Sequence, residues 1–168
     1  MADNHSKETR SYNMSRIRSK DTKPEEIVRK YLFAQGFRYR KNDSRYPGKP
    51  DIVLPKYKTV IFVNGCFWHG HDCKYYALPK SNVEFWRNKI KRNKDRDVED
   101  QKKLFSMGWH IIVVWECQLK PKSIQKTLES LANTLYHIYN NDRKIKTYEI
   151  PEEENYLTAA EDMECYND

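Results

Sequence analysis

The chain has 168 residues and an apolar fraction of 38%, enough for one domain with its own core, and no stretch approaches the roughly 20 apolar residues that cross a bilayer. An aromatic content of 13% excludes a chain that is disordered throughout. The formal net charge of +7 is unevenly spread, because residues 152–168 carry seven acidic side chains and no basic one.

The remaining basic body predicts a polyanionic partner. Residues 1–151 hold all 31 Lys and Arg but only 17 of the 24 acidic residues, a net charge of +14. Binding to nucleic acid relieves such self-repulsion, although a merely soluble basic protein has the same composition. We expect the acidic tail to lie outside the fold, as a disordered end or a weak competitor for the basic face. The lack of an apolar run after the first charges predicts no secretory signal and a cytoplasmic protein, in which Cys residues favour metal binding or free thiols over disulfides.

Residues 1–20 are predicted to form a flexible basic arm. They are polar, with Tyr12, Met14 and Ile17 interleaved among the charges. Such a segment either orders on DNA or is a plain flexible terminus, and composition leaves both interpretations open. The basic residues are Lys7, Arg10, Arg16, Arg18 and Lys20.

A helix that ends at Gly36 is predicted after this arm. Asp21 or Thr22 is suited to cap it, Pro24 suits its first turn, and Glu25 lies near the positive end of its dipole. Its apolar residues recur at helical spacing, at Ile27, Val28, Tyr31 and Leu32.

Four strands are predicted further along the chain. Residues 37–40 and 51–54 carry strand signals on either side of a Pro–Gly turn. Residues 59–63 form a continuous apolar run, which indicates a strand buried on both faces, and residues 110–115 indicate another buried strand.

Two more helices complete the predicted elements. Residues 83–107 indicate a long, solvated, basic helix, and residues 122–140 an amphipathic one. This order of elements implies a single α/β domain, which we expect at residues 21–141, with residues 142–168 as the acidic tail.

Four side chains suit zinc. Cys66, His71 and Cys73 follow directly after one predicted strand, and Cys117 follows another. If these strands are neighbours, the four residues form a closed tetrahedral Cys3His site, which is structural rather than catalytic. Free thiols and a surface His are the alternative, and Cys165 in the acidic tail is expected to be a free thiol.

Two further residues suggest chemistry on phosphate. Asp51 starts a predicted strand directly after a proline, where nucleases commonly place a carboxylate that holds magnesium at the scissile phosphate. His69 lies among the candidate zinc ligands, and a neutral imidazole accepts a proton at physiological pH. A lone His is more often structural, so the pattern by itself leaves its role open.

Three large rings, Phe67, Trp68 and Trp86, lie close to basic residues. Because Phe67 and Trp68 are consecutive, they cannot both point into one core from an extended segment. Aromatic side chains beside a basic surface can wedge between base steps, and a mismatch lowers the cost of that unstacking. The alternative, that two of the three rings fill the core, is equally open.

Together these residues resemble the very-short-patch-repair (Vsr-type) DNA mismatch endonucleases. The resemblance spans Asn13 to Gln118 and implies a restriction-endonuclease-like α/β fold, a central mixed sheet flanked by helices, that has lost the usual second acidic residue and lysine. The matching segments, which come in the same order, are residues 14–25, 50–53, 65–73, 96–97, 108–109 and 114–117, with Trp86.

The resemblance also implies residue roles. The aspartate matching Asp51 holds catalytic Mg²⁺, the histidine matching His69 is the general base, and the acid matching Asp97 supports it. The glutamate matching Glu25 helps to position water on the metal. The ligands of a structural Zn²⁺ match Cys66, His71, Cys73 and Cys117. The rings that intercalate at the mismatch match Phe67, Trp68 and Trp86, and the arm that clasps DNA from the other side contains Met14, Arg16, Arg18 and Lys20.

The function implied is a nick in one strand of duplex DNA, 5′ to the T of a T:G mismatch that arises from 5-methylcytosine deamination, which initiates very short patch repair. A monomer is expected, because one nick needs one active site. The expected partners are mismatched DNA, mismatch-repair proteins and a functionally linked cytosine methyltransferase, with no membrane. The alternatives are a homing- or restriction-associated endonuclease of the same fold, which cuts a specific paired site, and a zinc-containing DNA-binding module without catalysis.

One position departs from the family pattern. Well-known members carry Thr–His where this chain has Val63–Asn64. The Val63 backbone carbonyl is still able to ligate magnesium whatever its side chain, but Asn64 cannot transfer a proton as His does. We therefore expect nicking to be retained, at a lower rate.

Overall fold

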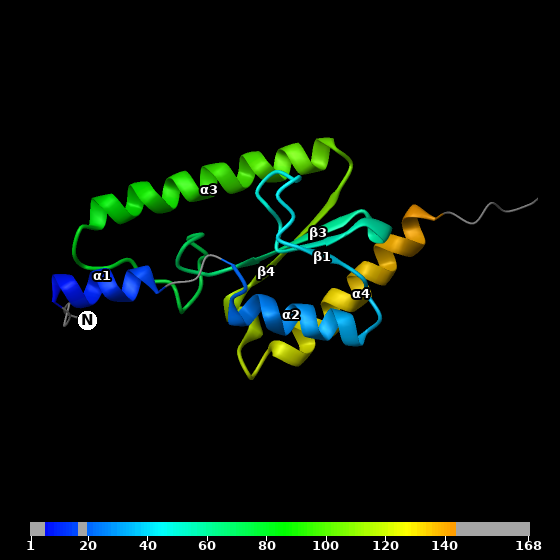
Figure 1. Cartoon of the computed structure of the whole chain (residues 1–168), viewed down its shortest axis with the longest axis horizontal. Helices are drawn as coiled ribbons and strands as arrows, with labels where there is room; N and C mark the ends of the chain where they lie inside the picture. Colours follow the sequence, from blue (N-terminus) through cyan, green and yellow to red (C-terminus); the bar gives the residue numbers. More distant parts are fainter. Residues whose placement is uncertain (1–5, 17–19, 144–168) are drawn as a thin grey trace, which may run out of the picture.

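The computed structural model describes residues 6–16 and 20–143 and has an α/β arrangement. Its helices flank a mixed sheet, with α2 and α4 on one face and α3 on the other (Figure 1). The strands β1, β2 and β3 pair antiparallel, and β4 pairs with β3 in parallel. The predicted α/β class with a mixed sheet is thus confirmed. In their order across the sheet, the strands are β1 (Arg40–Lys41), β2 (Ile52–Leu54), β3 (Thr59–Asn64) and β4 (His110–Trp115).

The helices include one that the sequence did not predict. The predicted helices are present as α2, α3 and α4, whereas α1 lies inside the expected arm and begins after Ser6, whose hydroxyl accepts a hydrogen bond from the backbone N–H of Thr9 at 3.2 Å. Within the described ranges, no helix has the length and apolar character needed to cross a bilayer. The bounds are α1 (Lys7–Ser15), α2 (Lys23–Ala34), α3 (Val83–Ser106) and α4 (Ile124–Asp142), with short 3-10 helices η1 (Pro55–Tyr57) and η2 (Glu116–Leu119).

Two apolar layers hold the sheet between its helices. The larger contains Leu32 of α2 and Leu135 of α4, which pack with residues such as Ile61 on β3. The smaller contains Leu104 of α3 against Val60 on the opposite face. β3 is therefore buried on both faces, as its continuous apolar run predicted.

Two strand predictions are corrected. The segment 110–115 forms a strand, but only Val114 in it is buried, because β4 lies at the edge of the described sheet with one neighbouring strand. Of residues 37–40, only Arg40 belongs to a strand. Phe37 instead enters the core, where its ring centroid lies 5.1 Å from that of Tyr57.

Candidate active site

The carboxyl ends of β3 and β4 bring the candidate residues together. Because the two strands are parallel, Asn64 at the end of β3 lies opposite Trp115 at the end of β4. The loop that starts at Gly65 and the segment that contains Cys117 therefore leave the sheet at the same end. The start of β2 also lies here, since β2 runs antiparallel to β3.

The predicted Cys3His group is assembled. Cys66, His71, Cys73 and Cys117 each offer one donor atom, and these atoms lie within 4.8 Å of one another. Nδ1 of His71 is 3.5 Å from Sγ of Cys117, and the His71 ring stacks on Trp115 with a centroid separation of 4.1 Å. Three sulfurs and one imidazole at this spacing suit a tetrahedral metal such as zinc.

The buried position of Cys66 supports a metal at this group. Burial raises the pKa of the Cys66 thiol to about 12, so the thiolate is unfavourable there without a cation. A bound divalent metal stabilises thiolates and removes their protons. The group is therefore better suited to hold a metal than to present a free reactive thiol.

Asp51 presents one carboxylate oxygen for a ligand. Its Oδ2 accepts a hydrogen bond from the backbone N–H of Val63 at 2.7 Å, and no hydrogen bond from the described residues reaches Oδ1. Burial raises the pKa of Asp51 to about 6, the Val63 N–H lowers it, and the charge of nearby Glu25 raises it further.

His69 and Asp97 form the second part of the site. Nδ1 of His69 lies 2.5 Å from Oδ2 of Asp97, which α3 carries. An ionised carboxylate only accepts hydrogen bonds, so the proton lies on Nδ1 and the lone pair on Nε2. When it is protonated, His69 is also close enough to lower the pKa of Asp51 by its positive charge.

Gly70 allows the loop to approach α3. Its φ is +56°, and a Cβ atom at this position would lie 2.7 Å from a methyl carbon of Ile90 and 2.6 Å from Cε of Lys94. A side chain here would clash with α3 and would also be strained by the positive φ. Glycine thus lets the loop lie against α3, where His69 reaches Asp97.

Glu25 is almost completely buried, although its predicted role is to help position water on a metal. It is 3% exposed, and its two oxygens accept four hydrogen bonds. Oε2 accepts from the Asp21 backbone N–H at 3.0 Å and from Arg29 at 3.2 Å. Oε1 accepts from the Thr22 backbone N–H at 3.2 Å and from its hydroxyl at 2.7 Å. Glu25 therefore caps the start of α2 as well as lying near Asp51.

The three predicted rings form a half-buried cluster outside the two apolar layers. The ring centroid of Phe67 lies 5.1 Å from that of Trp68 and 5.2 Å from that of Trp86. None of these rings belongs to either apolar layer. Two neighbours were missed. Phe85 is 54% exposed with its ring centroid 5.3 Å from that of Trp86, and Lys89 Nζ lies 5.3 Å from the ring centroids of both Trp residues. Both residues could have been predicted from the sequence, because Phe85 is an aromatic residue next to Trp86 and Lys89 follows about one helical turn later.

The other predicted residues lie apart from this cluster or outside the described ranges. Met14, Arg16 and Lys20 are exposed, and Arg18 and Cys165 fall outside the described residues. Asn64, at the departure from the family pattern, is 8% exposed at the end of β3, so the difference lies within the site.

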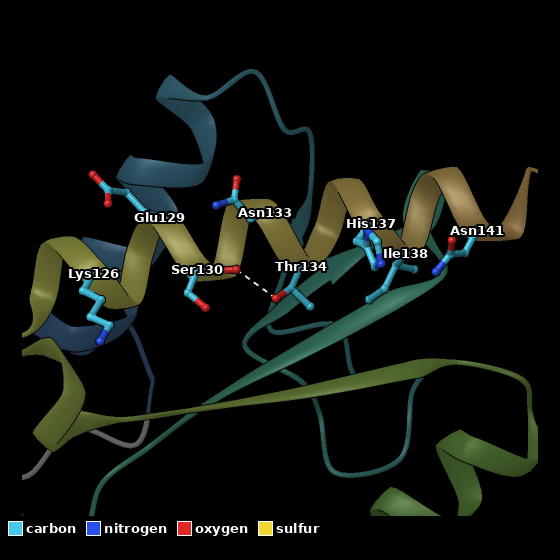
Figure 2. Close-up of a pocket in the computed structure, with 8 residues that line it drawn as sticks. All are labelled: Lys126, Glu129, Ser130, Asn133, Thr134, His137, Ile138 and Asn141. Carbon is cyan, nitrogen blue, oxygen red and sulfur yellow. Dashed lines mark hydrogen bonds between the residues drawn. The ribbon is translucent and has the colours of Figure 1, made fainter.

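A separate hollow lies on the outer face of α4 (Figure 2). Its lining runs from Lys126 to Asn141 and comes from this helix alone. Although the lining includes His137, it contains none of the predicted site residues, and we assign it no part in the chemistry.

Comparison with known proteins identifies the family. A family model described as DNA mismatch endonuclease Vsr matches residues 2–75. The chain is 57% identical over 124 residues to the type II nicking enzyme V.NmeAIP of Neisseria meningitidis, which covers 74% of this chain and 89% of that enzyme. It is 46% identical over 119 residues to the type II nicking enzyme V.XorIIP of Xanthomonas oryzae, which covers 71% and 88%. It is 42% identical over 135 residues to the DNA mismatch endonuclease Vsr of Escherichia coli, which covers 80% and 86%. The chain therefore belongs to the Vsr family of DNA mismatch endonucleases.

Proposed function

We propose that this protein nicks one strand of duplex DNA on the 5′ side of the T in a T:G mismatch and thereby initiates very short patch repair. The observation that carries the proposal is the hydrogen-bonded His69–Asp97 pair close to Asp51, at the end of the sheet. Relatives named as a mismatch endonuclease and as nicking enzymes support a single-strand cut. The aromatic cluster beside this site favours a mismatched target over a fully paired one.

Asp51 and the backbone carbonyl of Val63 would hold Mg²⁺. Oxygen donors suit this ion, and the feature of the structure that fits it is Oδ1 of Asp51, which accepts no hydrogen bond from the described residues. When bound, magnesium would offset the negative charge that develops on the scissile phosphate and on the leaving 3′ oxygen.

His69 would act as the general base. Its Nε2 accepts a proton from the attacking water as the water oxygen bonds to phosphorus and the bond to the 3′ oxygen breaks. The 3′ oxygen leaves as an alkoxide and takes a proton from a solvent water, so the products are a 5′ phosphate and a 3′ hydroxyl. Asp97 fixes the tautomer through Nδ1 and stabilises the imidazolium that forms. Glu25 contributes a nearby negative charge, and it would have to exchange one of its four hydrogen bonds to accept one from a water.

The remaining parts would support this reaction. We infer that zinc at the Cys3His group has a structural role, that the mixed sheet belongs to a restriction-endonuclease-like fold, and that residues 21–141 form the endonuclease domain between the arm and the acidic tail. The cluster of Phe67, Trp68 and Trp86 would enter the stack at the mismatch. The residues proposed to clasp the duplex from the other side are Met14, Arg16, Arg18 and Lys20.

A nicking assay tests this function. Duplexes that differ only by one T:G pair, in several flanking contexts, are incubated with Mg²⁺ and either the wild-type protein or Asp51→Ala. We expect a nick in the T strand of the mismatched duplex alone and none with the variant. Equal cutting of paired duplex would replace mismatch repair with a site-specific endonuclease. DNA binding without any cut in all contexts would favour a non-catalytic module.

A further inference from the structure

A buried arginine lies behind the proposed metal site. Arg29 of α2 is 7% exposed, and two of its nitrogens contact different carboxylates, Glu25 at 3.2 Å and Asp21 at 2.9 Å. Its backbone carbonyl accepts a hydrogen bond from the Tyr39 hydroxyl at 3.2 Å. Burying a guanidinium is costly unless it is paired, so this position is unusual for a residue with only a solubilising role.

Among the residues that the structure describes, Arg29 is the only positively charged side chain that donates a hydrogen bond to Glu25. The other three hydrogen bonds come from the Asp21 backbone N–H and from the backbone and hydroxyl of Thr22. These neutral donors define where the carboxylate lies but do not neutralise it. The charge of Glu25 is therefore balanced at this distance by Arg29 alone among the described residues.

The same charges reach Asp51. Glu25 and Arg29 both lie close enough to Asp51 for their charges to act on it, with opposite signs. Glu25 and Asp51 thus repel each other in a partly buried site, and Arg29 opposes that repulsion.

We propose that Arg29 is a positioning residue whose charge holds Glu25 beside Asp51, so that both carboxylates are in place before magnesium and DNA bind. The ion pairs of Arg29 are with Glu25 and Asp21 and not with Asp51 or His69, so its effect on the reaction is exerted through Glu25. This inference rests on the proposed function and assigns a residue that supports its metal site. Loss of such a supporting partner typically costs about 10–100-fold in metal affinity or activity.

The first test compares two ion pairs of the same spacing on α2. Arg29→Met removes the charge from the buried Glu25–Arg29 pair, and Lys30→Met removes it from the exposed Glu26–Lys30 pair, whose atoms are 2.8 Å apart. We expect Arg29→Met to lower kcat about 10–100-fold with KM for the mismatched duplex within about twofold of wild type. Lys30→Met should leave both constants unchanged, and Arg29→Lys should recover most of the lost kcat. A wild-type kcat in Arg29→Met, or no recovery with Lys, would overturn the proposal.

A double-mutant cycle separates positioning from a general loss of stability. Glu25→Gln removes the charge that Arg29 balances, so in that background Arg29→Met should cost little further kcat. Multiplicative losses would show that Arg29 does not act through Glu25. The double variant also has no unpaired buried charge at this pair, which keeps the test usable if Arg29→Met alone folds poorly.

A test that does not depend on catalysis measures how Mg²⁺ alone changes the Tm of the protein. Mg²⁺ added to the DNA-free protein should raise the Tm of wild type and Lys30→Met more than that of Arg29→Met. Equal shifts in all three would count against the inference. If wild type makes no Mg²⁺-dependent nick, the proposed function fails. If wild type nicks, Asp51→Ala does not, and Arg29→Met equals wild type, only the role of Arg29 fails.

Discussion

His69 and Asp97 meet although they are 28 positions apart in the chain. Replacing Asp97 with Asn leaves a side chain of the same shape, but its amide no longer stabilises an imidazolium and can hold the ring in the wrong tautomer. We expect Asp97→Asn to lower kcat by roughly 10²–10⁴-fold with little change in DNA affinity, measured by single-turnover nicking and by anisotropy.

Asp95→Asn is the matched control for that variant. Asp95 is exposed on the same helix, so its substitution changes the net charge equally without touching His69. If the two variants nick at similar rates, the His69–Asp97 pair has no part in proton transfer.

Asp51 carries a cost in stability that depends on pH. Burial raises its pKa to about 6, above the ordinary aspartate value of 3.8, so the folded protein disfavours the ionised form. The folded state therefore binds the proton more tightly than the unfolded chain, and the cost is present above pH 6 and disappears as the pH falls towards 4. In Mg²⁺-free buffer, Asp51→Asn should raise the Tm at pH 8 by roughly 2–6 °C and have little effect at pH 4. A Tm difference of the same size at both pH values would contradict this assignment.

At the residue scale, the sequence predicted which side chains meet but not how they are held. His69 and the four Cys3His residues follow strand ends and Asp51 directly precedes β2, so their grouping follows once β2, β3 and β4 are neighbours. Arg29 has no such signal, because a basic residue in an amphipathic helix is usually solvated and its burial depends on the carboxylates around it. Of the four hydrogen bonds to Glu25, the one from the Thr22 backbone N–H follows the capping-box spacing of Thr22 and Glu25, whereas the one from Arg29 depends on the burial of that arginine.

At the scale of elements, α3 connects the parts of the site. Its first turn presents Phe85 and Trp86 to the aromatic cluster, its middle holds Asp97, and Asn93 donates a hydrogen bond to the Trp68 backbone carbonyl at 2.9 Å. A movement of this one helix would therefore change both the proposed wedge and the proposed base.

The exposed ring of Phe85 gives a prediction about this helix. If it adds stacking surface to the wedge, Phe85→Ala should weaken binding to a T:G duplex about fivefold, equivalent to about 1 kcal/mol, and affect paired duplex less. Phe105→Ala is the control, because that ring is 77% exposed near the other end of α3. Fluorescence anisotropy titrations measure the affinity of each variant for the two duplexes. Equal affinities of Phe85→Ala and Phe105→Ala for the T:G duplex would exclude Phe85 from the wedge.

The elements that were predicted well are those with local boundary signals. α2 begins with a cap and Pro24 and is followed by Gly36 at φ +86°, and the apolar run of β3 is too continuous for an exposed strand. β1 has two residues and depends on its pairing with β2, while the exposure of β4 depends on its edge position. Such properties arise from neighbouring strands and leave little trace in a local window of sequence.

At the scale of the whole molecule, the Cys3His group joins the ends of β3 and β4 to the loop that carries His69. Cys66 lies just after β3 and Cys117 just after β4, while His71 and Cys73 lie on the loop that carries His69. A metal at this group would therefore hold the ends of two strands and the proposed base in one arrangement. Its loss should lower both stability and activity, in contrast to the loss of Mg²⁺, which should affect mainly activity.

Zinc removal tests this coupling. Structural zinc contributes several kcal/mol or more to folding, so Cys117→Ser should lower the Tm by roughly 10 °C or more and abolish nicking even in excess Mg²⁺. Cys165→Ser, a thiol in the acidic tail, should retain the wild-type Tm, nicking rate and one zinc per chain by elemental analysis. Chelator-stripped wild type should behave like Cys117→Ser and recover when Zn²⁺ is restored. Stripped protein that contains no zinc but keeps its Tm and nicks normally would show that the four side chains stabilise this end of the sheet without a metal.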